Sequence, residues 1–124
     1  KFTLDSIITK DTNIKLIKCD IEGYEIEFID CIWERLKNKK IENIILEISP
    51  NFRSNYPEYV LKISNLGYNV YDIGLSPQRK LNKNTKLSSL QSRLLQINNL
   101  EEMKTYINNF PEKQSNFLFS VNKY

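Results

Sequence analysis

A short apolar segment that ends in a cluster of acids constrains the fold of this chain most. Residues 14–20 are rich in isoleucine and leucine and predict a buried strand. Three acids then follow within six residues, around a glycine that lets the backbone turn. The acids are Asp20, Glu22 and Glu25, and the glycine is Gly23. Carboxylates crowded at the end of a strand rarely serve packing, so the segment predicts a functional site.

A second apolar run, residues 41–49, places Glu47 near its own end in a similar way. A nearly continuous apolar run is typical of a strand that is covered on both faces. Parallel neighbouring strands bring their carboxyl ends to one rim of the sheet, where open α/β sheets place their ligands. If these two strands are parallel neighbours, Asp20 and Glu47 converge on that rim.

Strand and helix patterns alternate along the chain, which favours an α/β layered sheet with right-handed crossovers. Pro57 suits the first turn of a helix, and Gly67 suits the end of one. A long polar loop near the C-terminus is the kind of segment that serves as a lid or a binding element. The predicted strands are 14–20, 41–49, 68–73 and 116–121; the predicted helices are 24–39, 57–66 and 100–110; residues 2–8 form an entry segment and residues 74–99 the polar loop.

Length and composition indicate one soluble domain with a single core. The chain has 124 residues, of which 40% are hydrophobic and 27% charged. No apolar run approaches the roughly 20 residues of a membrane span, and no secretory leader precedes the first strand. Lys1 rather than methionine comes first, so we expect the sequence to start inside a longer polypeptide.

Charge and residue types exclude several function classes. The net charge of +3 is carried mostly by scattered lysines, and the basic clusters 35–40 and 79–86 do not interleave aromatic residues. We therefore expect solvated faces there, with neither a nucleic-acid nor a membrane partner. Histidine is absent, which excludes Ser-His-Asp and Cys-His catalysis and the common zinc motifs. Cys19 and Cys31 are too few for a disulfide framework, so we expect both to be reduced and buried in a cytoplasmic protein.

Glycine usage is also informative. The chain has three glycines, and none lies in a GxGxxG or P-loop pattern. Any glycine-rich cofactor cradle would therefore have to lie upstream of residue 1.

Three segments in order and spacing resemble the FkbM family of S-adenosylmethionine-dependent methyltransferases. They are FTLDSII, IKLIKCDIEGYEIEFI and IENIILEIS, and the likeness is dense over residues 2–49 and thinner afterwards. The resemblance implies a Rossmann-like seven-stranded α/β sheet, mostly parallel with an antiparallel last strand. Residues 1–124 would hold its fourth to seventh strands, and the cofactor-binding N-terminal half would be absent. It also implies methylation of a hydroxyl on a sugar, polyketide or similar metabolite.

The same resemblance assigns site residues. The pattern positions fall on Asp5, on Lys18, Asp20, Glu22, Gly23 and Glu25, and on Glu47. Asp20 is the candidate general base, or orients the acceptor, and is also the predicted cofactor contact. Glu47 and Lys18 are the further catalytic candidates. Glu22, Gly23 and Glu25 are assigned to substrate binding.

Each assignment has a structural alternative. Asp20 could cap the following helix through backbone amides, a common role for aspartate. Glu47 could form an ion pair with Lys18 or Arg53, or share a divalent cation with Asp20, although a metal site is not favoured. Glu25 could be a helix cap or an internal hydrogen-bond partner. As a whole, the chain could be the acceptor-side half of an enzyme or a non-catalytic half-domain that serves interaction or folding.

Overall fold

The computed structural model describes residues 4–51, 54–74, 93–110 and 114–124. Within these ranges, strands and helices alternate much as the hydrophobic pattern predicts. The elements are η1 (Leu4–Ser6), β1 (Ile14–Cys19), α1 (Glu25–Cys31), α2 (Trp33–Lys37), β2 (Ile41–Ile48), α3 (Tyr56–Asn65), β3 (Asn69–Gly74), α5 (Leu100–Asn108) and β4 (Ser115–Ser120). None of the helices in these ranges is long and apolar enough to cross a bilayer.

The four strands form one sheet in the order β1-β2-β4-β3. β1 and β2 are parallel, whereas β4 is antiparallel to both of its neighbours, β2 and β3. β1, β2 and β3 therefore share one direction, and the last strand in the sequence runs the other way between two of them. The predicted α/β class, with a parallel first pair and an antiparallel last strand, is confirmed for these four strands. A seven-stranded sheet stays a prediction.

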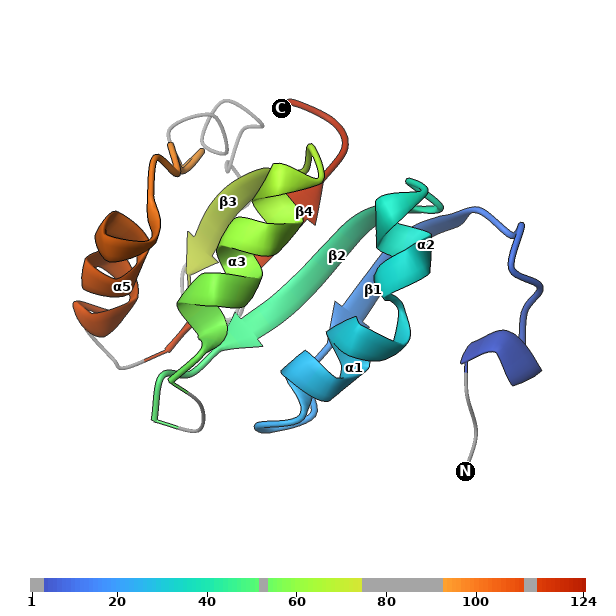
Figure 1. The fold of residues 1–124 in the computed structure, drawn as a ribbon, viewed down its shortest axis with the longest axis horizontal. Helices are drawn as coiled ribbons and strands as arrows, with labels where there is room; N and C mark the ends of the chain where they lie inside the picture. Colours follow the sequence, from blue (N-terminus) through green and yellow to red (C-terminus); the bar gives the residue numbers. More distant parts are fainter. Residues whose placement is uncertain (1–3, 52–53, 75–92, 111–113) are drawn as a thin grey trace, which may run out of the picture.

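The helices α1, α2 and α3 cover one face of this sheet (Figure 1). Side chains of β2 and β4 that alternate toward that face are fully buried against them, as the two-residue period of a strand requires. Phe117 and Phe119 of β4 are both 0% exposed. One small, closely packed space is lined jointly by Ile26 and Ile29 of α1, Val60 and Ile63 of α3, and Leu46 and Ile48 of β2. This interface is the hydrophobic core.

The predicted helix 24–39 is wrong as a single element, because it is two helices that meet at Ile32. The backbone there has φ −104° and ψ 10°, and the Ile32 N–H donates to both Phe28 O and Ile29 O, at 3.1 and 3.2 Å. Because of this tightened turn, α2 runs in a different direction from α1. Arg35, expected on the solvent side, is instead buried and donates to the carbonyls of Thr9 at 3.0 Å and Ile8 at 3.2 Å.

The outer edge of β3 is partly paired by the segment that precedes α5. The Leu95 N–H donates to Val70 O at 2.8 Å, and the Asp72 N–H donates to Arg93 O at 3.1 Å. Residues 93–95, near the end of the predicted polar loop, therefore run beside β3. Residues 75–92 of that loop lie outside the described residues, and its role as a lid or a binding element stays a prediction.

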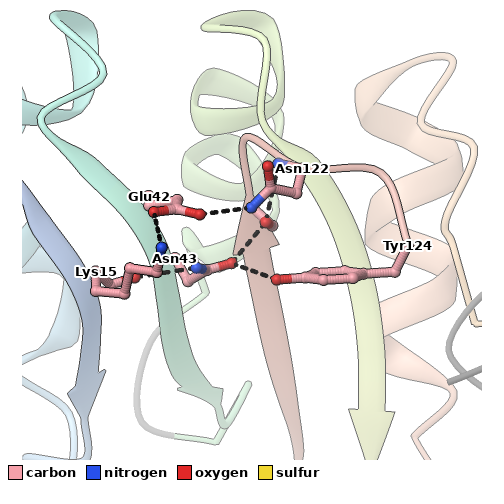
Figure 2. A network of polar contacts seen from close by, with 6 residues as sticks. Lys15, Glu42, Asn43, Asn122 and Tyr124 are labelled. Atoms are coloured by element: carbon pink, nitrogen blue, oxygen red, sulfur yellow. Dashed lines mark hydrogen bonds and ion pairs between the residues drawn. The ribbon is translucent and has the colours of Figure 1, made fainter.

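A polar network ties the amino-terminal ends of β1 and β2 to the C-terminal residues (Figure 2). The Asn43 side chain donates to Lys15 O at 3.0 Å and accepts from Ser120 Oγ at 2.6 Å and Tyr124 Oη at 3.1 Å. A second branch joins Asn122 Nδ2 to Glu42 at 2.7 Å, and Glu42 pairs with Lys15 at 3.3 Å. These groups satisfy one another at the end of the sheet opposite the acids, which marks the network as structural.

Candidate functional site

The parallel pairing of β1 and β2 sets the position of the two principal acids. Cys19, the last residue of β1, pairs with Leu46 of β2. Asp20 and Glu47 each come one residue later, so they emerge side by side at the carboxyl ends of the two strands. The convergence expected from the sequence is present. Asp20 is exposed and Glu47 is half-buried, so both carboxyls can reach a ligand at this rim.

Glu47 is held in a setting that favours its protonated form. Its carboxyl accepts a hydrogen bond from Ser49 Oγ at 3.1 Å. Burial is the largest influence and raises the pKa of Glu47, the Ser49 bond opposes this, and the charge of Asp20, a hydrogen bond with Asp20 and the charge of Glu25 raise the pKa further. Glu47 therefore keeps its proton to a higher pH than an ordinary glutamate does.

Glu25 lies inside the protein, at only 2% exposure. A single carboxylate oxygen, Oε2, accepts from the Gly23 N–H at 3.0 Å and from Tyr56 Oη at 2.8 Å. This arrangement matches the internal hydrogen-bond role considered for Glu25. Direct contact between Glu25 and a substrate stays a prediction, and the burial of Glu25 does not favour it.

The turn between β1 and α1 contains two residues with positive φ. Gly23 has φ +91°, a conformation that glycine adopts at little cost, and Glu22 has φ +34°. Glu22 is exposed and remains available to a ligand. The helix begins at Glu25, five residues after Asp20, with Tyr24 at the N-cap and no side-chain capping bond. The alternative in which Asp20 caps this helix is therefore wrong.

Lys18 lies on β1 opposite Ile45 and is exposed. No ion pair joins it to Glu47 among the residues that the structure describes, so that structural alternative is not found. The other suggested partner, Arg53, lies outside the described residues. A catalytic role for Lys18 stays a prediction.

The two cysteines occupy different environments. Burial, followed by the charges of Glu25 and Asp20, raises the pKa of Cys19 to about 12, which keeps this thiol protonated and unreactive. Cys31 is exposed, so the expectation that both cysteines are buried is wrong for Cys31, which lies on the outer side of α1. Both cysteines are free.

Sequence reasoning missed two residues of this site, Tyr56 and Ser49. Ser49 follows Glu47 by two residues, and its proximity to an acid was the signal that could have suggested a bond. Tyr56 is 31 residues from Glu25, and no local pattern links them. Within the described ranges, no group of three or more His, Cys, Asp or Glu side chains could hold a metal ion.

A larger hollow, about 610 Å³ in volume, lies elsewhere, between the end of β3 and α5. Three acids line it. Asp72 accepts hydrogen bonds from Tyr106, Ser115 and the Gly74 amide, Glu102 accepts one from Asn98, and Glu101 pairs with Lys104, so all three are engaged within the protein. The hollow holds none of the predicted site residues. The rim with Asp20 and Glu47 remains the candidate site.

Three strands that run in one direction, one strand that runs in the other, and helices packed on a face of the sheet define a mixed α/β domain. Comparison with protein families matches residues 1–70 to the methyltransferase FkbM domain, a range that runs from η1 into β3. The chain therefore belongs to the FkbM methyltransferase family, of whose domain it carries a part. Searches of curated proteins and of solved structures gave no match.

Proposed function

We propose that this chain is the acceptor-side half of an S-adenosylmethionine-dependent O-methyltransferase. Its acceptor would be a hydroxyl of a sugar, polyketide or similar metabolite. The observation that carries the proposal is the placement of Asp20 and Glu47, which each follow a paired residue of β1 and β2, at the rim of a sheet in an FkbM-family chain. No nucleic-acid, membrane or metal partner is needed for this role, and a cytoplasmic location stays a prediction.

To catalyse methyl transfer, a protein aligns the methyl donor with the acceptor hydroxyl, removes the hydroxyl proton and excludes competing water. When bound, S-adenosylmethionine supplies a methyl group on a sulfonium cation. Asp20 would accept the acceptor's hydroxyl proton as the oxygen bonds to the methyl carbon and the bond from that carbon to sulfur breaks, which leaves a neutral thioether. Glu47, which accepts a hydrogen bond from Ser49, would be the second carboxyl beside the acceptor.

The residues present fit part of such a cofactor. Exposed carboxylates at the rim, Asp20 and Glu22, provide the negative potential that a sulfonium cation requires. The three glycines of this chain form neither a phosphate-binding loop nor a glycine-rich cofactor-binding loop. We therefore place most of the cofactor pocket on a preceding segment of the same polypeptide, with Asp20 as the contact from this half.

The direct test is Asp20→Asn in the polypeptide that joins this chain to its cofactor-binding half, assayed by transfer of labelled methyl to hydroxyl acceptors. The substitution keeps shape and hydrogen bonding but removes the base and its charge, so turnover should fall about a hundred- to ten-thousand-fold, far more than cofactor affinity does. Asp11→Asn, at an exposed position away from the rim, is the matched control. Undiminished turnover in Asp20→Asn would contradict the assignment of Asp20 as the general base.

The second candidate is a non-catalytic half-domain that serves interaction or folding. The lack of a glycine-rich cradle in these 124 residues favours it. Calorimetric titration of residues 1–124 with S-adenosylmethionine should show weak binding or none under the enzyme proposal. Tight binding would place a pocket within these residues and contradict the division into halves. A joined polypeptide that binds the cofactor but transfers no methyl to any acceptor would support the non-catalytic role.

A further inference from the structure

The turn that carries the acids is tied to a distant helix by one buried carboxylate. Glu25 Oε2 accepts one hydrogen bond from the Gly23 amide in the turn and one from Tyr56 Oη at the start of α3. Tyr56 comes 31 residues after Glu25 in the sequence. Burial of a carboxylate is costly unless it accepts hydrogen bonds, and here one oxygen accepts two. The link therefore fixes where the turn lies relative to α3.

The turn needs such an anchor because its backbone is unfavourable on its own. Glu22 has φ +34°, a left-handed conformation that is unfavourable for a non-glycine residue. Conformations of this kind persist where the surrounding structure imposes them. The Gly23 amide is held only three residues after Asp20, so its anchor limits how far the Asp20 carboxyl can move from Glu47.

We propose that Tyr56 and Glu25 are positioning residues that hold Asp20 against Glu47, a role that rests on the proposed function of that acid pair. Both side chains are buried, at 2% exposure each, so we assign them no direct contact with the reacting atoms. Tyr56 orients Glu25, Glu25 holds the Gly23 amide, and the turn then presents Asp20 at the rim.

Tyr59 provides a matched control on the same helix. Its hydroxyl donates to the Asp30 carboxylate at 2.9 and 3.1 Å, so it too joins α3 to an acid of α1. That bond is exposed and lies beyond the turn. Tyr56→Phe and Tyr59→Phe therefore each remove a hydroxyl that links α3 to an α1 carboxylate, but only the first affects the anchor of the turn.

The first experiment measures the pKa of Glu47 by carbon-detected NMR on residues 1–124. In Tyr56→Phe the Asp20 carboxyl should move away, and the pKa of Glu47 should fall by the part of its shift that Asp20 causes, while the larger part that burial causes remains. Tyr59→Phe should leave the pKa of Glu47 raised. An unchanged value in a folded Tyr56→Phe protein overturns the proposal, whatever the activity.

Glu25→Gln and Glu25→Ala keep the proposal testable if Tyr56→Phe does not fold. Glutamine retains a carbonyl oxygen that can accept both bonds, so the Gly23 amide should stay protected from hydrogen exchange. Alanine removes both bonds, and this amide should exchange faster. Equal exchange in the two variants contradicts the role of Glu25.

The second experiment measures methyl transfer in the joined polypeptide. Displacement of Asp20 by about 1 Å should lower kcat about 100-fold in Tyr56→Phe, with KM for the cofactor unchanged, while Tyr59→Phe retains turnover. If Asp20→Asn itself leaves turnover intact, the proposed function fails, and the NMR titration alone decides the positioning role. If Asp20→Asn is impaired but Tyr56→Phe is not, the positioning role is wrong.

Discussion

Glu47 shows how one residue takes its chemistry from groups that the sequence does not place beside it. Its half-burial, its bond from Ser49 and its contact with Asp20 arise because two parallel strands end together. The same setting makes Glu47 unfavourable for folding when it is ionised. Under the proposed function, Glu47 exchanges stability for reactivity.

Glu47→Gln should therefore stabilise the chain in a pH-dependent way. The pKa of Glu47 is raised in the folded state, so the folded protein binds this proton more tightly than the unfolded chain does. The resulting stability is fully present below the unfolded pKa and is lost as the pH rises through the folded pKa. Near pH 7 the melting temperature of Glu47→Gln should exceed that of the wild type, and near pH 4 the two should coincide. Exposed Glu34→Gln is the control, and a pH-independent difference would contradict the assignment.

At the scale of elements, the turn from α3 to β3 depends on Gly67. Its φ is +99°, and a Cβ there would lie 3.1 Å from Lys39 Nζ, which is itself seated 4.5 Å from the centre of the Tyr68 ring. Gly67→Ala should lower the free energy of unfolding by about 1–2 kcal/mol, because the left-handed conformation disfavours a side chain. Urea denaturation measures this. Asn65→Ala, exposed at the end of α3, should change little, and equal losses in both would point to the helix rather than the turn.

The elements themselves were largely predictable, whereas their breaks and long-range bonds were not. Apolar runs ending in acids indicated the parallel pair, and Pro57 and Gly67 marked the ends of α3 well. The break at Ile32 escaped notice because the apolar spacing continues through it from α1 into α2. Arg35 looked solvent-facing because its carbonyl partners, Ile8 and Thr9, lie 27 and 26 residues away. Periodicity reports which side of a helix is apolar, but not which distant backbone groups will reach its polar side.

At the scale of the whole molecule, β1 is the open edge of the sheet. The order β1-β2-β4-β3 leaves its outer side without a strand among the described residues, and Leu16 on it is 54% exposed. We expect residues 1–124 to self-associate, since unpaired edges pair readily with other chains. Sedimentation velocity should show concentration-dependent dimers or larger species. Leu16→Lys should reduce them, exposed Lys123→Ala should not, and a monodisperse wild-type monomer would contradict this expectation.

The place of β4 in the sheet has a consequence for how the chain is made. This strand is synthesised after β1, β2 and β3, yet it lies between β2 and β3 and hydrogen-bonds to both. While the ribosome is still translating, β1 and β2 can pair, but β3 can bond only to residues 93–95 on its outer edge until β4 has left the exit tunnel. These four strands therefore form one sheet only after Ser120 has emerged, and a nascent chain stalled before Ser115 would present β3 to the chaperones without the strand that joins it to β2.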